Sequence, residues 1–415
     1  MLASEMKKTV AVILAGGTGT RLYPLTDHRA KPAVPFGGKY RIVDFTLSNC
    51  LHSDIRRILI LTQYRSHSLL KHLRNGWSVL SPEMGEYITA IPAQMKEGEH
   101  WYQGTADAVF QNIDLLRWND AKYVIVLSGD HVYRMDYAAM LRQHTALGSE
   151  ATVACIPVRL SQSQSFGVVE INSDLSVCGF VEKPDRPKCM QGQPDHCLAS
   201  MGIYIFNKNK LINKLIEDQN NRESSHDFGK DILPQWAALG GVSAYMFGGQ
   251  SGRVSADSYW RDVGTLDAYY EANMDLLKPV PPINLYQQDW PIRTYNSQNA
   301  PCRTGPSGSG KHETLDNVIM GSGSTIIGAR VKNSILFNHV HIEADASIED
   351  SIVFTDVKIG EGAMLQRCIV DKHVDIPAHE RIGFDREKDS LRFKISDGGV
   401  TIIPMGYQFN GSGND

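Results

Sequence analysis

Glycines and an arginine follow the first apolar run of the chain. The strand expected at Thr9–Leu14 leads into Ala15, Gly16 and Gly17, and the run then continues Thr-Gly-Thr to Arg21. Glycines at a strand end let backbone N–H groups approach a phosphate closely, and arginine adds a planar fork of donors. The loop has neither a Walker A ending nor the G-x-G-x-x-G spacing. Taken alone, it is explained equally well as a tight turn without a ligand.

The segment after this loop is rich in cations and almost free of acids. It contains His28, Arg29, Lys31 and Arg41, and Lys31 precedes a proline, which favours extended backbone there. The segment predicts a local anion site, with a solvated basic loop as the alternative. The chain as a whole carries a net charge of -4, so no basic field would hold nucleic acid or an anionic membrane.

Two carboxylates stand where an α/β sheet places its ligands. Asp130 follows the expected strand Tyr123–Leu127 in a Ser-Gly-Asp-His sequence, and Asp262 lies in Tyr-Trp-Arg-Asp-Val-Gly. Two such groups suit Mg²⁺, a hard cation that shares its ligands with substrate phosphates. Each aspartate alone is as well explained as a turn or helix cap. Lys183, in Glu-Lys-Pro, repeats the Lys-Pro pattern and offers a second phosphate contact.

These groups together fit one kind of chemistry. Glycines and cations surround a polyphosphate, two acids hold a metal, and a further lysine remains for a monophosphate. Nucleotidyl transfer needs this set, because a sugar phosphate attacks the α-phosphorus of a nucleoside triphosphate. The attacking oxygen is already ionised, so catalysis reduces to alignment and neutralisation of charge.

The elements that must position these residues alternate in type. From Thr9 to about Leu277, β-branched runs alternate with amphipathic stretches such as Ser66–Arg74 and Thr105–Trp118, which are expected to be helices. This pattern predicts an α/β catalytic domain over residues 1–280, with a Rossmann-like mixed, mostly parallel sheet. A Pro-, Gly- and Ser-rich stretch at 281–314 reads as a linker.

A repeat with a period of 17 follows the linker. Ile342, Ile359 and Ile376 are 17 residues apart, and each is followed six residues later by Ile348, Leu365 or Ile382. This is the hexapeptide spacing of a parallel β-helix, expected over 315–415 with a C-terminal tail. An irregular β domain is the alternative. The ends of such a stack need covering, so we expect contact with the other domain or another subunit.

Composition indicates a soluble globular protein. The 415 residues are 42% hydrophobic and 21% charged. The seven cysteines are odd in number and contain no C-x-x-C, which argues against a disulfide framework and a zinc cluster. The N-terminal apolar run is too short for a signal peptide or a membrane span, so a cytoplasmic location is expected.

Longer motifs carry a family resemblance over about residues 8–400. AGGTGTRLYPLTDHRAKPAVPFGGKYRIVDF, WYQGTADAV, SGDHVY, FVEKP, SSHDFGKDILP and YWRDVGT together resemble bacterial glucose-1-phosphate adenylyltransferases, also called ADP-glucose pyrophosphorylases. The resemblance implies formation of ADP-glucose and pyrophosphate from ATP and α-D-glucose 1-phosphate with Mg²⁺, the committed step of glycogen synthesis. It also implies a left-handed β-helix, a homotetramer and small anionic allosteric effectors.

The resemblance also implies a role for individual residues. Arg21 and Lys31 would hold the triphosphate, Asp130 and Asp262 the metal, and Lys183 the sugar phosphate. The glucose would be surrounded by Tyr102, Gly167, Glu182 and Ser200. The nucleotide pocket would be lined by Leu14, Ala15, Gly16, Gly17, Gln94 and Gly104. The amide of Gln94 is the group suited to read a base edge.

Two departures concern phosphate contacts. Thr18 replaces an arginine that is frequent in bacterial members, and His28 stands where regulated members commonly have lysine or arginine. The usual sugar-phosphate effector is therefore in doubt, although His28, Arg29 and Arg41 still form a possible effector site near the domain contact. An imidazole should bind a phosphorylated effector less well than a lysine.

Three other functions compete with this one. A non-catalytic regulatory paralogue would have lost a metal aspartate or an essential cation, and none is lost. Another nucleotide or sugar is possible with the same chemistry. An acyltransferase would use a histidine of the β-helix, from the set His339, His341, His373 and His379.

Overall fold

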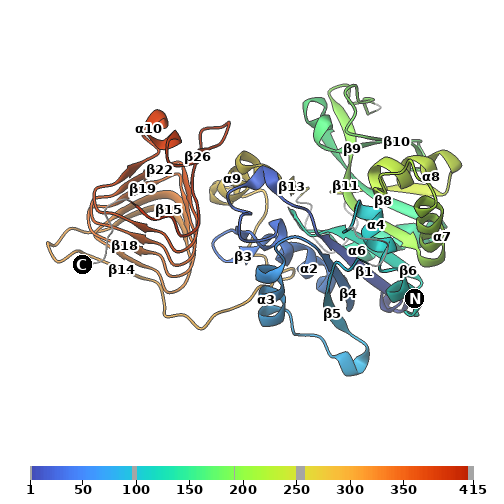
Figure 1. Cartoon of the computed structure of the whole chain (residues 1–415), viewed down its shortest axis with the longest axis horizontal. Helices are drawn as coiled ribbons and strands as arrows, with labels where there is room; N and C mark the ends of the chain where they lie inside the picture. Colours follow the sequence, from blue (N-terminus) through green and yellow to red (C-terminus); the bar gives the residue numbers. More distant parts are fainter. Residues whose placement is uncertain (1, 96–100, 191, 249–257, 410–415) are drawn as a thin grey trace.

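The chain folds into an α/β body followed by a stack of β coils (Figure 1). The computed structural model describes residues 2–95, 101–190, 192–248 and 258–409. In the figure the α/β body runs from blue to green and the stack from orange to red, with helix α9 (Leu266–Met274) between them. Every helix in those ranges falls short of the length and apolar character needed to cross a bilayer.

The central sheet has a parallel middle. Strand β1 (Thr9–Ala15) lies between β4 (Arg57–Thr62) and β6 (Tyr123–Ser128), and β5 (Tyr87–Pro92) continues beyond β4, all parallel. On the other side of β6, β11 (His196–Asn207) runs antiparallel. The outer strands are β8 (Ala151–Arg159), β9 (Gly167–Ile171), β10 (Val177–Glu182) and β12 (Val242–Met246). The predicted mixed, mostly parallel sheet is confirmed.

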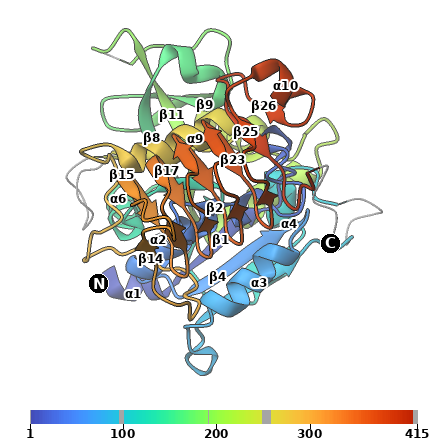
Figure 2. The same ribbon diagram turned by 90° about the vertical axis from the view of Figure 1, so that its left-hand side faces the viewer.

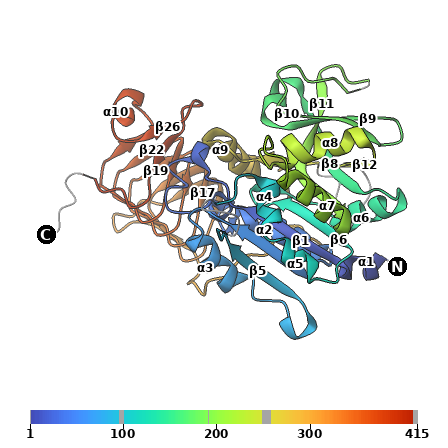
Figure 3. The same cartoon turned by 45° about the vertical axis from the view of Figure 1, so that its right-hand side comes forward.

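Helices bury both faces of this sheet, which explains why β1 is apolar at consecutive positions (Figure 3). Val10 and Val12 pack on one face, and Ala11 and Ile13 on the other. The first face is covered by α4 (Thr105–Phe110), α5 (Ile113–Arg117), α7 (Lys208–Gln219) and α8 (Leu233–Leu239). The second is covered by α2 (Ile42–His52), α3 (His67–Gly76) and α6 (Tyr137–Ala146).

The expectation of one helix over Thr105–Trp118 is wrong, because α4 and α5 are separate. The amide of Asn112 bonds to the carbonyl of Val109, and its side chain bonds to the carbonyl of Ala108 at 2.9 Å. Asparagine side chains compete in this way with the helical hydrogen bonds of the backbone. The other expected helix, Ser66–Arg74, is confirmed by α3 with its ends shifted by one to two residues.

The second domain is a parallel β-helix, and Figure 2 shows its coils side by side. Ile348 pairs with Val331 on one side and Leu365 on the other, in the predicted register of 17. Ile342 and Ile359 pair in the same register on another face of the coil. All of these side chains are buried inside the stack. The hexapeptide spacing therefore places one apolar residue per coil on each internal row.

The expected linker lies against both domains. Strand β14 (Arg303–Gly305) falls within residues 281–314 yet pairs in parallel with β16 (Thr325–Ile327) of the β-helix. Nearer the catalytic domain, the indole N–H of Trp290 donates to the side chain of Asn49 at 3.0 Å. The linker is thus anchored by packing and hydrogen bonds at each end.

Contacts between the two domains were expected, and the structure shows them. The buried guanidinium of Arg29 bonds through both nitrogens to the carboxylate of Asp371 in the β-helix, at 2.9 and 3.1 Å. Asp267, at the start of α9, accepts hydrogen bonds from the hydroxyl of Ser396 and the amide of Gly398. The β-helix is therefore fixed to the segment that immediately precedes Lys31.

Candidate active site

A cavity of about 530 Å³ opens at the carboxyl ends of β1 and β6, where ligands bind in open α/β sheets. Nine of the residues expected from the sequence line it. They are Leu14, Ala15, Gly16, Gly17, Arg21, Lys31, Tyr102, Gly104 and Asp130. The structure adds lining residues that sequence reasoning missed: Gln63, Tyr64, Thr105, Ser128, Asp227 and Gly264. Gln63 directly follows β4, and its place at a strand end is the signal that could have found it.

The glycine-rich loop turns sharply at Gly19. This residue has a φ of 64°, in the left-handed region that glycine adopts at little cost. Its carbonyl accepts a hydrogen bond from the hydroxyl of Thr26 at 2.9 Å. A Cβ atom at Gly19 would also lie 3.0 Å from a methyl carbon of Thr26. The turn keeps Gly16 and Gly17 on the wall of the cavity.

Lys31 lies between the two predicted metal ligands. Its Nζ atom is 2.8 Å from Oδ2 of Asp130 and 2.8 Å from Oδ1 of Asp262. Burial opposes the charged form of Lys31, but the two carboxylates outweigh it and raise the pKa of Lys31. Burial likewise works against ionised Asp130, yet Lys31 and His131 hold the pKa of Asp130 below its ordinary value. Lys31 and Asp130 are therefore both charged at neutral pH.

Strand pairing brings the two aspartates together across the chain. Strand β13 (Trp260–Asp262) pairs antiparallel with β7 (His131–Tyr133), and Asp262 stands opposite His131. One ligand atom each from Asp130, His131 and Asp262 lies within 4.8 Å of the others. Carboxylates are the ligands that hard divalent cations prefer. The residues present thus fit a divalent metal, which Asp130, His131 and Asp262 could hold.

His131 is a neighbour of the two aspartates to which the sequence analysis assigned no role. Its Nε2 atom lies 3.5 Å from Asp130 and 3.9 Å from Asp262, and its ring packs edge-on against Trp260. Gly264 was also missed. A Cβ at Gly264 would lie 3.0 Å from both the guanidinium of Arg21 and the carboxylate of Asp262, so glycine permits this close approach.

The residues expected around glucose form a second group beside the cavity. A Cβ at Gly167 would lie 2.8 Å from Oε2 of Glu182, and one at Gly229 would lie 2.7 Å from the same oxygen. Lys183 is half exposed and 3.3 Å from Oε1 of Glu182. Ser200 is buried on β11. Of the five residues expected to bind glucose 1-phosphate, Tyr102 lines the 530 Å³ cavity. The other four, Gly167, Glu182, Lys183 and Ser200, do not line it.

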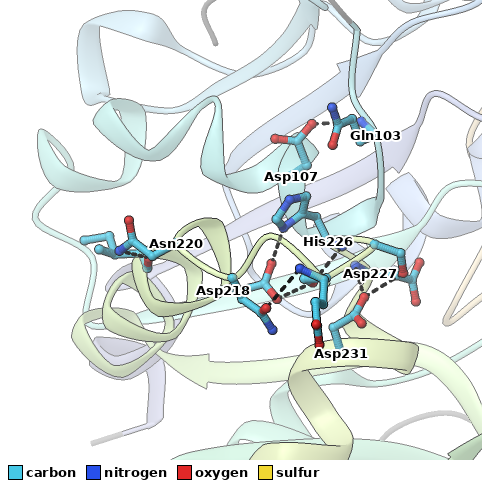
Figure 4. Close-up of polar contacts among 12 residues, drawn as sticks. Gln103, Asp107, Asp218, Asn220, His226, Asp227 and Asp231 are labelled. Carbon is cyan, nitrogen blue, oxygen red and sulfur yellow. Dashed lines mark hydrogen bonds and ion pairs between the residues drawn. The ribbon is translucent and has the colours of Figure 1, made fainter. Parts of the chain in front are cut away.

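Hydrogen bonds join the start of α4 to the segment around residue 227, part of which Figure 4 shows. The hydroxyl of Thr105 donates to Asp227 at 3.0 Å and accepts from the amide of Phe228 at 2.9 Å. The carbonyl of His226 accepts from the amide of Ala106 at 2.9 Å, while the ring of His226 bonds to Asp218 at 2.8 Å. This network holds the first turn of α4 against the segment around residue 227.

Two residues expected in the nucleotide pocket differ in position, because Gly104 lines the cavity and Gln94 does not. Gly104 precedes α4, and a Cβ there would lie 2.2 Å from the carbonyl oxygen of His226, so no larger residue fits without movement. Gln94 lies just beyond β5, is exposed, and does not line the cavity. Tyr102 lines the cavity, and its hydroxyl accepts a hydrogen bond from Asn112 at 2.9 Å. Burial raises the pKa of Tyr102, so its hydroxyl stays protonated.

The three residues expected at an effector site, His28, Arg29 and Arg41, differ in how free their side chains are to bind a ligand. The guanidinium of Arg29 is occupied by Asp371, whereas His28 is half exposed and 3.7 Å from Asp27. Arg41 donates to the carbonyl and hydroxyl of Ser68, at 3.0 and 2.8 Å. Burial lowers the pKa of Arg41 to about 10. It also lowers the pKa of Lys372, a neighbour from the β-helix, to about 8, with help from Arg41 and Arg29.

Comparison with known proteins agrees with this fold. The nucleotidyl transferase family model matches residues 10–279, and the model of the GlmU-like C-terminal hexapeptide region matches residues 300–403. The α/β body is thus that of a nucleotidyl transferase. Enzymes of this class generally use a divalent metal ion.

Relatives that match over nearly their full length identify the family within the nucleotidyl transferase class. Glucose-1-phosphate adenylyltransferase 2 of Vibrio cholerae is 56% identical over 405 residues, which cover 98% of this chain and all of that protein. Glucose-1-phosphate adenylyltransferase of Yersinia pseudotuberculosis serotype O:1b is 47% identical over 407 residues, covering 97% of this chain and 95% of that protein. The chain belongs to the glucose-1-phosphate adenylyltransferase family.

Proposed function

We propose that this protein transfers the adenylyl group of ATP to α-D-glucose 1-phosphate, forming ADP-glucose and pyrophosphate with Mg²⁺ as the metal. The observation that carries the proposal is the Lys31–Asp130–Asp262 cluster beside a glycine-lined cavity, in a chain whose relatives bear this activity in their names. The product would supply glucosyl units for glycogen synthesis in the cytoplasm.

The triphosphate would lie along the glycine-rich loop. Gly16, Gly17 and Arg21 line the cavity. The backbone N–H groups of the two glycines would bind phosphate oxygens, and Arg21 would add a bidentate donor. The phosphate oxygen of the sugar attacks the α-phosphorus of ATP, the new P–O bond forms, and pyrophosphate leaves with the electrons of the broken bond. A Mg²⁺ ion held by Asp130 and Asp262 would neutralise charge on the phosphates.

Lys31 has two tasks in this mechanism. It balances the charges of Asp130 and Asp262, and its buried ammonium is close enough to the cavity to stabilise negative charge that moves onto the leaving pyrophosphate. No proton has to be removed from the nucleophile, because a phosphate monoester is ionised at neutral pH. Catalysis therefore rests on alignment and charge neutralisation.

The sugar phosphate would enter from the side of Glu182. Lys183 has a backbone φ of 48°, and its half-exposed ammonium, which is 3.3 Å from Glu182, would contact the phosphate. Glu182 accepts hydroxyl hydrogen bonds, with Gly167 and Ser200 nearby, and Tyr102 donates from the cavity wall. Gln94 remains the residue proposed to read the adenine edge, which requires its segment to approach the cavity when nucleotide binds.

Regulation by small anionic effectors is part of the proposal. Arg41 and Lys372 place two cations at the contact between the domains, beside the Arg29–Asp371 ion pair. An anion bound there would act two residues from Lys31, with His28 as a more exposed neighbour. The β-helix offers open coils for assembly, and we propose a homotetramer.

One assay tests the activity and its base preference. The purified protein is offered ATP, UTP, GTP or dTTP with glucose 1-phosphate and Mg²⁺, and release of pyrophosphate is followed. ATP should give the highest kcat/KM. A preference for another nucleotide would assign a sister activity, and no release with any nucleotide would favour a regulatory paralogue. Light scattering on the same sample tests the tetramer.

A further inference from the structure

A second cavity lies outside the active site, between helices α4, α5 and α7, which Figure 3 shows on one face of the central sheet. Its volume is about 310 Å³, and it shares none of the described residues that line the active-site cavity. Its walls come from α5 and from the C-terminal ends of α4 and α7. The polar side chains that line it are Gln111, Asp114, Arg117, Gln219 and Asn220.

Two glutamine side chains of this cavity each leave an acceptor unused. Gln111 is 4% exposed, and its Nε2 atom donates to Asp107 at 2.9 Å, so the carboxamide is held in one orientation. Its Oε1 atom is buried and has no hydrogen-bond partner among the described residues, and the same is true of Oε1 of Gln219. A buried acceptor without a partner costs free energy. A ligand that donates hydrogen bonds would recover this free energy.

A third carboxamide is arranged in the same way. Asn220, at the end of α7, directs its Nδ2 atom to the backbone carbonyl of Ile216 at 2.9 Å (Figure 4). Its donor is therefore used within the helix, and its Oδ1 atom is left to accept. Three side-chain amides at one cavity thus offer acceptors, which are the partners that a ligand rich in hydroxyl groups requires.

The charged groups of the cavity balance each other. Arg117 lies 3.5 Å from Asp114, one turn earlier on α5, and these two are the charged residues among the described residues that line the cavity. A lining of zero net charge attracts neither an anion nor a cation at long range. Hydroxyl groups therefore fit the unused acceptors better than ammonium groups do.

Apolar side chains complete the site. Phe110, Ile113 and Ile216 also line the cavity. Trp118 directly follows α5 and is 81% exposed, and its amide bonds to the carbonyl of Asp114 at 2.9 Å. Helical residues four apart lie on one face, so Trp118 and Asp114 share a side of α5. An exposed indole beside amide acceptors offers a flat apolar surface on which a ring can stack.

We propose that this cavity binds an uncharged carbohydrate of two or more sugar units, at a site separate from the active site. One ring lies between Gln111 and Gln219, where its hydroxyl groups donate to the carboxamide oxygens and its C–H groups pack on the apolar side chains. A neighbouring ring stacks on Trp118, which lies beyond the lining of the cavity. The ligand carries no phosphate, so this site differs in chemistry from the one proposed for glucose 1-phosphate.

Isothermal titration calorimetry on the full chain tests the proposal, with maltotetraose and glucose as probes. Maltotetraose should bind at one site per chain, and glucose should bind more weakly because a single ring cannot fill the cavity and reach Trp118 together. Saturating glucose 1-phosphate should leave the affinity for maltotetraose unchanged, since the two sites share no lining residue among those described.

Two variants and one control locate the binding. Trp118→Ala should weaken maltotetraose roughly tenfold through loss of the stacking surface and leave glucose nearly unchanged. Gln219→Leu should weaken both probes, because it removes an acceptor from the cavity, and it should not lower the melting temperature, because that acceptor has no partner in the protein. Tyr286→Ala removes an equally exposed aromatic ring outside the cavity and should keep the full affinity.

Four results would overturn the proposal. The site would be refuted by absence of binding at millimolar maltotetraose, or by binding that Gln219→Leu leaves unchanged. Displacement of maltotetraose by glucose 1-phosphate would assign the binding to the active site instead. Equal affinities for glucose and maltotetraose would refute the second sugar unit and the role of Trp118. None of these outcomes bears on whether the protein makes ADP-glucose.

Discussion

The ammonium nitrogen of Lys31 lies 2.8 Å from a carboxylate oxygen of Asp262, although 231 residues separate the two in the chain. The same ammonium is 2.8 Å from Asp130. A single buried cation thus stands between two carboxylates that would otherwise repel each other in a site of low dielectric. Removing either kind of charge should therefore disturb the local balance of charge and the proposed metal binding.

Neutral isosteres of the two aspartates test the metal assignment. Asp130→Asn and Asp262→Asn should each lower kcat at least ~10²-fold, because each removes charge that holds the metal on the phosphates. Circular dichroism should show both variants folded. Asp54→Asn, an exposed aspartate paired only with Arg56, serves as the control and should keep its kcat. Near-normal kcat in an active-site variant at saturating Mg²⁺ would remove that aspartate from the metal site.

Lys183 is expected to discriminate between the two substrates. Lys183→Ala should raise KM for glucose 1-phosphate by about an order of magnitude or more and leave KM for ATP nearly unchanged, since a charge-assisted contact contributes roughly 1.5–3 kcal/mol. Lys188→Ala is a matched control, because Lys188 is exposed and paired with Glu170. Equal increases in both Michaelis constants would show that Lys183 does not select the sugar phosphate.

The ion pair between Arg29 and Asp371 should stabilise the contact between the domains. Both side chains are almost fully buried, so Asp371→Asn would leave a buried guanidinium without its counter-charge, which typically costs about 3–5 kcal/mol. The measurement is urea unfolding followed with probes in both domains. Separation of the transitions of the two domains is expected in the variant. An unchanged unfolding curve would show that the pair contributes nothing to docking.

If a phosphorylated effector binds at the domain contact as proposed, Lys372 should make its binding depend on pH. Burial and two neighbouring arginines lower its pKa to about 8, from an ordinary value of 10.5. Lys372 is thus charged below pH 8 and neutral above it, so half-saturation by a phosphorylated effector should rise as pH increases from 7 to about 9. Lys372→Met should weaken binding at pH 7 and flatten the profile. Parallel profiles for the two proteins would exclude Lys372 from the effector site.

The lowered pKa of Lys372 should also make the stability of the protein depend on pH. Between pH 8 and 10.5 the unfolded chain holds a proton on Lys372 that the folded chain has lost. The free energy of unfolding should therefore rise with pH in this window, and the cost of burying the charge is largest below pH 8. Unfolding of wild type and Lys372→Met at pH 7.5 and 10 checks this, and an equal pH response in both would contradict it.

Local patterns in the sequence predicted most of the fold. The 17-residue spacing of Ile342 and Ile359 follows directly from coil geometry, and the glycine-rich run after β1 follows from the needs of a phosphate loop. Long-range pairings were beyond such patterns. Nothing near Asp262 in the sequence states that it stands opposite His131, and nothing near Arg29 points to Asp371.

The sequence also did not predict where the backbone of a glycine packs closely against another segment. Gly104 and Gly264 look like ordinary small residues in the sequence, and only the folded neighbours His226 and Arg21 show why a Cβ would not fit. The break between α4 and α5 was also not predicted. The apolar periodicity of the segment indicates one continuous helix, whereas the side-chain hydrogen bond of Asn112 that competes with the helix leaves no comparable pattern in the sequence. Sequence periodicity records burial, whereas these features depend on individual contacts.

Gly104 and Gly17 offer a matched pair that separates packing from ligand binding. Both line the active-site cavity, but a Cβ at Gly104 would lie 2.2 Å from the carbonyl oxygen of His226, whereas one at Gly17 meets nothing within 4 Å. Gly104→Ala should therefore destabilise the protein by about 1–3 kcal/mol, as overpacking does. It should also raise KM for ATP, because the first turn of α4 must move away from residue 226.

Gly17→Ala should leave the free energy of unfolding nearly unchanged. It should still raise KM for ATP, because its methyl group would occupy space beside the backbone donors of the phosphate loop. Chemical denaturation and steady-state kinetics on both variants make the comparison. If Gly17→Ala kept a normal KM for ATP, the triphosphate would not lie along this loop. If Gly104→Ala were as stable as wild type, the backbone near residues 104 and 226 would be able to move apart at little cost. Glycine would then not be required at position 104.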